Sequence, residues 1–136
     1  MARRGSALQS YANTAVPSHR SKEQVEELLK KVGAVGFRWS SFGGQETLEA
    51  GLEWNDGKIA FRLVVNYEDD RQRKQKLRAL YWYLKAKVEA IQFGLVDLEQ
   101  EFLPYMLTPS GRTVFEEIPE AQRRGWLLEA PSEDGA

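Results

Sequence analysis

Three stretches between residues 35 and 65 alternate apolar side chains with polar or small ones, which is the period-two pattern of a β-strand. A Gly43-Gly44 turn separates the first stretch from the second, and Asn55-Asp56-Gly57 separates the second from the third. The latter turn is a strong hairpin signal, because these residues tolerate positive φ. The alternating apolar positions are Val35, Phe37, Trp39, Leu48, Ala50, Leu52, Trp54, Ile59, Phe61, Leu63 and Val65. The pattern predicts three antiparallel strands with one apolar face.

The opposite face of this sheet is expected to meet water, because it carries Glu49, Glu53, Lys58 and Arg62. The apolar face needs a cover, and the sequence supplies one in a long helix that begins after Asp69 or Asp70 and ends at Gly94. Its apolar residues recur at helical spacing and form one narrow seam. They are Leu77, Leu80, Leu84, Val88 and Ile91.

A shorter helix is predicted before the first strand. Ser21 and Gln24 have the spacing of a capping box, and Gly33 is suited to end the helix in the left-handed conformation. Between them, Val25, Leu28, Leu29 and Val32 follow the spacing of one helix face.

The segment after Gly94 predicts short elements. Asp97 to Gln100 is a second capping box, and Pro104 ends or kinks the helix that follows. Two alternatives fit the next residues: Thr113 to Glu116 cap another helix, or 112–115 form an edge strand that pairs with 105–107. The sequence leaves both open.

These elements define an α+β fold class, with an antiparallel sheet of three or more strands covered by one long helix and with additional short helices. A chain of 136 residues has room for one domain. We expect a flexible basic arm at 1–20, a single domain at 21–128 and a disordered acidic tail at 129–136.

Composition narrows the chemistry. The chain has no cysteine, which excludes a disulfide framework, a cysteine-bearing zinc site and a thiol nucleophile. Its one histidine, His19, falls in the expected arm, where nothing would hold it in a catalytic triad. No stretch approaches the roughly 18 apolar residues of a membrane span. We therefore expect a cytoplasmic protein with no membrane contact, no cofactor and no bound metal.

The acidic clusters have structural explanations. Glu68, Asp69 and Asp70 precede the long helix, where carboxylates favour the positive end of the helix dipole. Asp56 and Lys58 faintly match the acid-x-lysine pattern of metal-dependent nucleases, but they lie at a predicted hairpin tip. A metal-dependent nuclease-like enzyme remains the weakest alternative.

The most distinctive surface is the side of the long helix opposite the apolar seam. A basic stripe beside an aromatic ring suits phosphate contacts with stacking, or an acidic protein surface. The alternative is a solvated face that keeps an amphipathic helix soluble. The predicted partner-binding residues are Arg71, Lys74, Arg78, Trp82 and Lys85.

Several segments together resemble a group of small uncharacterised α+β proteins encoded by tailed phages and prophages. The resemblance covers residues 17–118 and carries no catalytic residue with it. It implies a phage or mobile-element setting inside a host cell, where proteins of this size often bind host machinery. The segments are Lys31–Phe37, Leu77–Leu80, Lys85–Ala90, Leu98–Leu103 and Pro109–Val114.

The expected function is therefore binding and not catalysis. The leading hypothesis is a non-catalytic phage-type accessory protein that binds a macromolecular partner, namely a host or phage protein complex, and inhibits a host defence or nucleic-acid-processing complex. The alternative is a direct DNA- or RNA-binding protein that uses the basic helix face.

Overall fold

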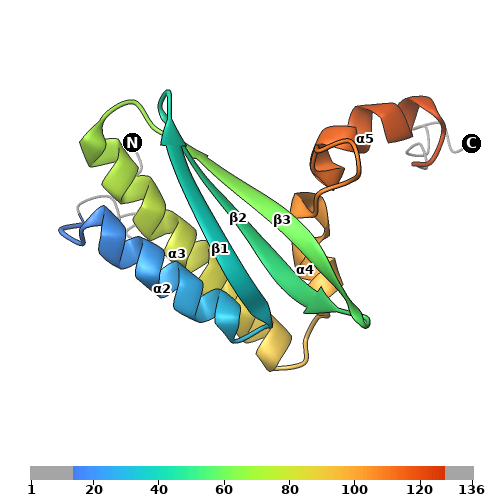
Figure 1. The fold of residues 1–136 in the computed structure, drawn as a ribbon, viewed down its shortest axis with the longest axis horizontal. Helices are drawn as coiled ribbons and strands as arrows, with labels where there is room; N and C mark the ends of the chain where they lie inside the picture. Colours follow the sequence, from blue (N-terminus) through green and yellow to red (C-terminus); the bar gives the residue numbers. More distant parts are fainter. Residues whose placement is uncertain (1–13, 128–136) are drawn as a thin grey trace, which may run out of the picture.

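The computed structural model describes residues 14–127 (Figure 1). Its elements confirm the α+β class. In chain order they are α2 (Ser18–Lys30), β1 (Ala34–Phe42), β2 (Gln45–Trp54), β3 (Gly57–Asn66), α3 (Asp70–Gln92), α4 (Leu98–Phe102), the 3₁₀ helix η2 (Leu103–Tyr105) and α5 (Val114–Arg123).

The three strands form an antiparallel sheet in the order β1-β2-β3, as the alternation predicted. Trp54 pairs with Gly57 across a two-residue turn, and the turn residues Asn55 and Asp56 have φ values of 47° and 65°. Positive φ at both positions is what a tight hairpin of this length requires. The turn sets the register, so apolar residues of neighbouring strands fall on one face.

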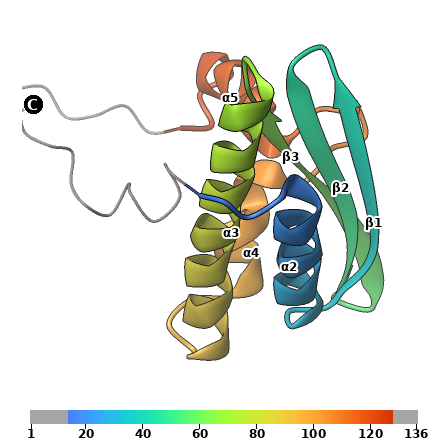
Figure 2. The same cartoon turned by 90° about the vertical axis from the view of Figure 1, so that its left-hand side faces the viewer.

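The long helix α3 covers that face as predicted, and the shorter helices α2 and α4 pack beside it, with Phe102 of α4 against Phe61 of β3. Figure 2 shows α2 and α3 side by side on the same side of the sheet. The core lies between the layers, where Val25 of α2 and Leu84 of α3 are fully buried with strand residues such as Leu52 and Phe61. The seam of α3 faces this core as predicted, with Leu77, Leu84 and Val88 buried and the other two residues partly buried.

The predicted start of the first helix is wrong by one turn. The helix begins at Ser18 after Pro17, so residues 18–20, expected in the arm, are helical. Ser21 does not cap it. This side chain lies four residues before Val25, on the same buried face, and is itself fully buried. Residues 1–13 of the predicted arm and the predicted acidic tail, 129–136, lie outside the described residues.

The C-terminal segment follows the helix alternative, and of the alternative strand at 112–115 only Thr113 pairs with the 105–107 segment. Thr113 Oγ1 accepts a hydrogen bond from the backbone N–H of Glu116 and caps α5, and the Glu116 carboxylate accepts one from the backbone N–H of Thr113. Thr113 also pairs with Leu107 in a short antiparallel bridge. A single residue can do both because an N-cap residue has extended backbone dihedrals.

One carboxylate lies in the core. The side chain of Glu46 on β2 is completely buried and accepts a hydrogen bond from Arg73 Nε of α3 at 2.9 Å. Its second oxygen, Oε2, lies 2.6 Å from Lys22 Nζ of α2, an ion pair without hydrogen-bond alignment. Lys22 also lies over the ring of Trp39 on β1. The three charges tie both helices to the middle strand.

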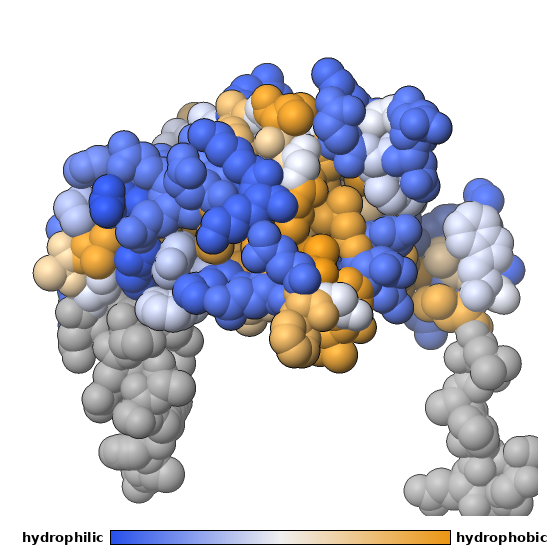
Figure 3. Space-filling view, turned by 90° about the horizontal axis from the view of Figure 1, so that it is seen from below, coloured by the Kyte–Doolittle hydropathy of each residue, from blue (hydrophilic) through white to orange (hydrophobic). Residues whose placement is uncertain are grey.

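The end of the molecule where α3 terminates carries apolar surface. Seen from below in Figure 3, apolar residues come to the surface between polar regions. Phe93 and Leu95, which follow α3 in the chain, are both strongly exposed.

Candidate functional site

The predicted basic face of α3 is not a continuous exposed stripe. Arg78 is only 7% exposed, and its NH2 group donates a hydrogen bond to Gln24 of α2. Its guanidinium also lies 4.3 Å from the centre of the Tyr81 ring. Burial lowers the pKa of Arg78. The wheel projection assigned this side of α3 to solvent, but α2 packs against it, so the expectation that Arg78 lies on a free surface is corrected.

The other four residues of the predicted face differ in exposure. Lys85 pairs with Glu89 at 2.6 Å, and that hydrogen bond raises the pKa of Lys85. Trp82 is 44% exposed and packs edge-on against Tyr81, while Arg71 is exposed and Lys74 is half-buried. Their binding role remains a prediction, with Trp82 and Arg71 the most accessible.

A different surface has the geometry of a binding site: the outer edge of β3. In an antiparallel ladder, alternate residues direct both backbone groups away from the neighbouring strand. The carbonyl of Ala60 points outward, because it accepts a hydrogen bond from the N–H of Leu107 at 2.8 Å. Val64 and Asn66 stand at the same phase of the strand, so their N–H and C=O groups point outward too. Of the residues from 14 to 127, only 106 and 107 pair with this edge.

An apolar groove lies on the helix side of this open edge. We call it the helix-side groove; its volume is about 570 Å³. Its floor is the second half of β3, and α3 forms the opposite wall. It is lined by Leu63, Val64, Val65, Asn66, Lys76, Ala79, Leu80, Tyr83 and Tyr105.

A second groove lies on the other side of the same edge. We call it the α5-side groove; its volume is about 410 Å³. Val64, 45% exposed, and Tyr105 line both grooves, so the two flank the same backbone. Phe115 at the start of α5 is 67% exposed here. The remaining lining residues are Arg62, Pro104, Thr113 and Glu116.

The wall between the grooves is held by a polar cluster. The hydroxyls of Tyr83 on α3 and Tyr105 on η2 hydrogen-bond each other. Lys87 lies over the Tyr83 ring at 4.8 Å and donates to the carboxylate of Glu101 at 2.7 Å. Burial raises the pKa of Tyr105, and its hydrogen bond with Tyr83 acts in the same direction. Burial alone would lower the pKa of Lys87, but bonds to Glu101 and Tyr83 leave it raised.

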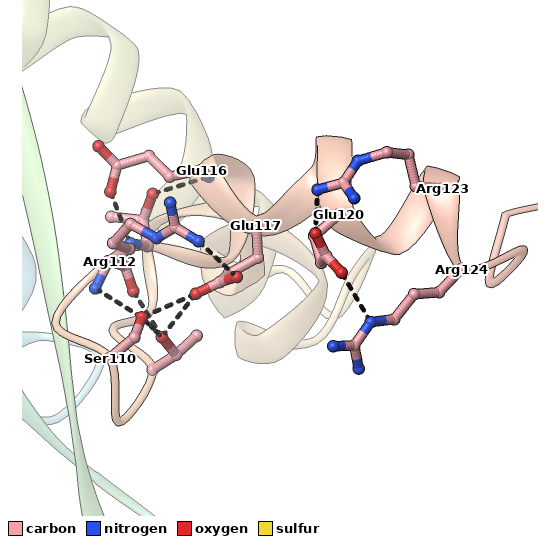
Figure 4. Close-up of polar contacts among 9 residues, drawn as sticks. Ser110, Arg112, Glu116, Glu117, Glu120, Arg123 and Arg124 are labelled. Atoms are coloured by element: carbon pink, nitrogen blue, oxygen red, sulfur yellow. Dashed lines mark hydrogen bonds and ion pairs between the residues drawn. The ribbon is translucent and has the colours of Figure 1, made fainter.

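A second set of polar contacts joins the 108–112 turn to α5 (Figure 4). Glu117 accepts hydrogen bonds from Ser110 Oγ at 2.8 Å and from Arg112 at 3.1 Å, so the turn before α5 is bound to the helix itself. The hydrogen bond from Ser110 is the largest cause of the lowered pKa of Glu117. Farther along α5, Glu120 accepts a hydrogen bond from Arg124 and pairs with Arg123.

The open face of the sheet connects to this turn through Arg62 of β3. Arg62 donates to Glu49 of β2 at 3.0 Å and to the carbonyl of Gly111 at 3.1 Å. Glu49 also pairs with Arg38 of β1, and this hydrogen bond is the main cause of its lowered pKa. On the face predicted to be exposed to solvent, Arg38, Glu49 and Arg62 thus form a chain of ion pairs. The hydrogen bond from Arg62 to Gly111 connects this chain to the 108–112 turn and so helps to position Phe115.

One residue in the sequence could have indicated this site, although the prediction of the strands did not take it into account. Val64 stands on the polar face of β3, where its neighbours at the same phase are Arg62 and Asn66. An exposed β-branched residue there breaks the alternation. Tyr105 and Phe115 gave no such signal, because only the chain path after Pro104 brings them to β3.

Neither the arrangement of the described residues nor comparison with known proteins assigns an activity to the chain. Within residues 14–127, no group of three or more histidine, aspartate or glutamate side chains is placed to hold a metal ion. None of the helices in that range is long and apolar enough to cross a bilayer. Searches against family models, curated proteins and solved structures found no match.

Proposed function

We propose that this chain acts by binding a partner protein at the open edge of β3. The observation that carries the proposal is the unpaired stretch of β3 between the helix-side and α5-side grooves, because exposed strand edges pair readily with another chain. The binding surface is the backbone of Val64 to Asn66, with Tyr83 and Phe115 as aromatic contacts. Aromatic residues are favoured at the centres of protein interfaces.

The local construction supports this role. Two polar clusters, one around Tyr105 and one around Glu117, hold the groove walls, so little order has to be gained on binding. The wider hypothesis is that the partner is a component of a host complex and that binding inhibits it, in the phage setting implied by the sequence resemblance.

Direct nucleic-acid binding through α3 is the less favoured function. Phosphate contacts need exposed cations, whereas Arg78 is buried and Lys85 is paired with Glu89. A salt titration with a labelled duplex distinguishes the two. Strong binding at low salt that is lost on changing Arg71 and Lys74 to glutamate would favour the nucleic-acid alternative.

Site-specific photocrosslinking tests the proposal. A benzophenone amino acid at position 64 is expected to capture one defined protein when the full chain is expressed in its host. Position 35 is the matched control, because Val35 is also an exposed strand valine, 55% against 45%, but lies on β1. Equal capture at 35 and 64, or none at 64, would refute the assignment of the surface.

The site can also be probed by substitution. Val64→Arg is expected to abolish co-purification of the partner identified by crosslinking, since a long cation would occupy the groove, while Val35→Arg leaves co-purification unchanged. Circular dichroism of both variants checks that each is folded. If the partner is recovered equally with both variants, the β3 edge is not the binding surface.

A further inference from the structure

The structure also indicates the form that the partner takes at this site. We infer that the open half of the β3 edge accepts an extended peptide segment as an added strand, with alternating apolar residues and one acidic side chain. This inference rests on the proposed function, because it specifies how the same site is used.

The chain already uses the neighbouring part of this edge in the same way. Met106 bridges Phe61, and the N–H of Leu107 donates to the carbonyl of Ala60. The residues just before them form the 3₁₀ helix η2 and do not continue the pairing, so β3 extends alone to Asn66. Val64 and Asn66 each present one donor and one acceptor, spaced two residues apart. An extended backbone matches that spacing, whereas a helix bonds its own backbone groups and cannot.

The two grooves determine the side-chain preferences. Successive side chains of a strand point to opposite faces, so an added strand would direct alternate residues into the helix-side groove and the α5-side groove. Both grooves have largely apolar linings, with Leu80 and Tyr83 in one and Val64 and Phe115 in the other. An aliphatic or aromatic residue is therefore expected at each inward position.

The charge beside the groove explains why the bound peptide segment is expected to carry an acidic residue. Lys76 is exposed on the rim of the helix-side groove, near Asn66, and no described carboxylate pairs with it. The other charges near the edge are already engaged, since Arg62 binds Glu49 and Glu116 binds the N–H of its own cap residue. A carboxylate at the Asn66 end of the peptide would complement Lys76.

A second copy of this chain is the less suitable occupant. Pairing two β3 edges would bring two sets of flanking walls together, because each copy carries η2 and the start of α5 beside its own edge. Tyr105 and Phe115 of each would meet their counterparts. The space between the walls suits one strand with side chains and no second sheet.

Hydrogen exchange at single residues tests the strand. The probe is the tightest binder selected from a random octapeptide library against the full chain, and a scrambled version is the control. The outward amides of Val64 and Asn66 are expected to exchange at least tenfold more slowly with the peptide bound. The amide of Val65 faces β2 and is expected to change little, so it serves as an internal reference.

A proline substitution isolates the backbone contribution. Val64→Pro removes an N–H that β2 does not use, and proline is tolerated at such edge positions. It is expected to weaken the selected peptide about tenfold, the value of about one backbone hydrogen bond of 1.4 kcal/mol. Val64→Thr keeps the N–H and the β-branched shape but changes the apolar side chain, so it is expected to weaken the peptide less than Val64→Pro does, and the difference between the two variants reports the N–H.

The outcomes separate this inference from the proposed function. Peptide binding that protects neither Val64 nor Asn66 and is unaffected by Val64→Pro would overturn strand addition, while capture at position 64 would leave the binding surface intact. Failure of both peptide selection and capture at 64 would overturn both. Concentration-dependent protection of these amides without peptide, together with dimer formation in sedimentation, would assign the edge to a second copy and overturn the peptide.

Discussion

The buried carboxylate of Glu46 offers the sharpest test of how this fold is stabilised. Glu46→Gln keeps the shape of the side chain and removes its charge, so no cavity contributes to the effect. Removing one member of a buried ion pair costs about 3–5 kcal/mol. Lys22 and Arg73 retain 20% and 24% side-chain exposure, so both can regain water and the cost falls near the lower end, about 3 kcal/mol.

Urea denaturation followed by circular dichroism measures this loss. With an m-value of about 1.5 kcal/mol/M, a loss of about 3 kcal/mol lowers the midpoint by about 2 M, and Tm falls by about 12 °C. Glu53→Gln is the matched control, because Glu53 lies on the same strand but is exposed; it should change stability by less than about 0.5 kcal/mol. If Glu46→Gln costs under about 1 kcal/mol, the ion cluster does not hold the two helices to β2.

Three further outcomes follow from named contacts. Arg78→Met should leave stability unchanged or raise it by about 1 kcal/mol in urea titrations, because the buried cation has no carboxylate partner among the described residues; a loss above about 2 kcal/mol would contradict this. Thr113→Ala removes the α5 cap and should cost about 1 kcal/mol, with faster amide exchange confined to α5; unchanged exchange there would contradict the capping role. The pKa of Tyr105 is raised in the folded state, so the unfolded chain loses the phenol proton at lower pH than the folded chain does. The stabilisation linked to this proton is therefore complete below about pH 10 and is lost as the pH rises. In thermal melts from about pH 8 to 11, Tm should fall less steeply with pH in Tyr105→Phe than in the original chain, and identical slopes would exclude this linkage.

Local signals were sufficient for most of the fold. The Asn55-Asp56 turn requires positive φ and sets the register of β2 and β3, which explains why the strand pattern was confirmed. The cap at Asp97 was predicted for the same reason, and Asp69 was one of the two caps predicted for the long helix, since a cap depends on the adjacent turn alone. The predicted cap at Ser21 was wrong because its spacing to Gln24 matched a capping box, whereas tertiary packing places Ser21 on the buried face of α2.

The candidate site could not be predicted from local sequence patterns. The wheel projection of α3 separates an apolar side from a polar side, but it cannot tell that α2 will cover part of the polar side and bury Arg78. The β3 edge required a non-local fact as well. Residues 105 and 115 reach Val64 only because Leu107 pairs with Ala60, about fifty residues earlier in the chain.

The position of η2 explains why one half of the β3 edge is closed and the other half open. An unprotected edge invites association of whole sheets, and proteins commonly prevent this with a covering segment or a bulky flank. Here residues 106–107 cover the first half, and Tyr105, held by Tyr83, stands beside the second. That arrangement obstructs a second sheet but leaves the outward groups of Val64 within reach of a single strand. Selectivity for a strand over a sheet then depends on the rigidity of Tyr105, which is why its contacts with Tyr83 and Lys87 belong to the site as much as the edge does.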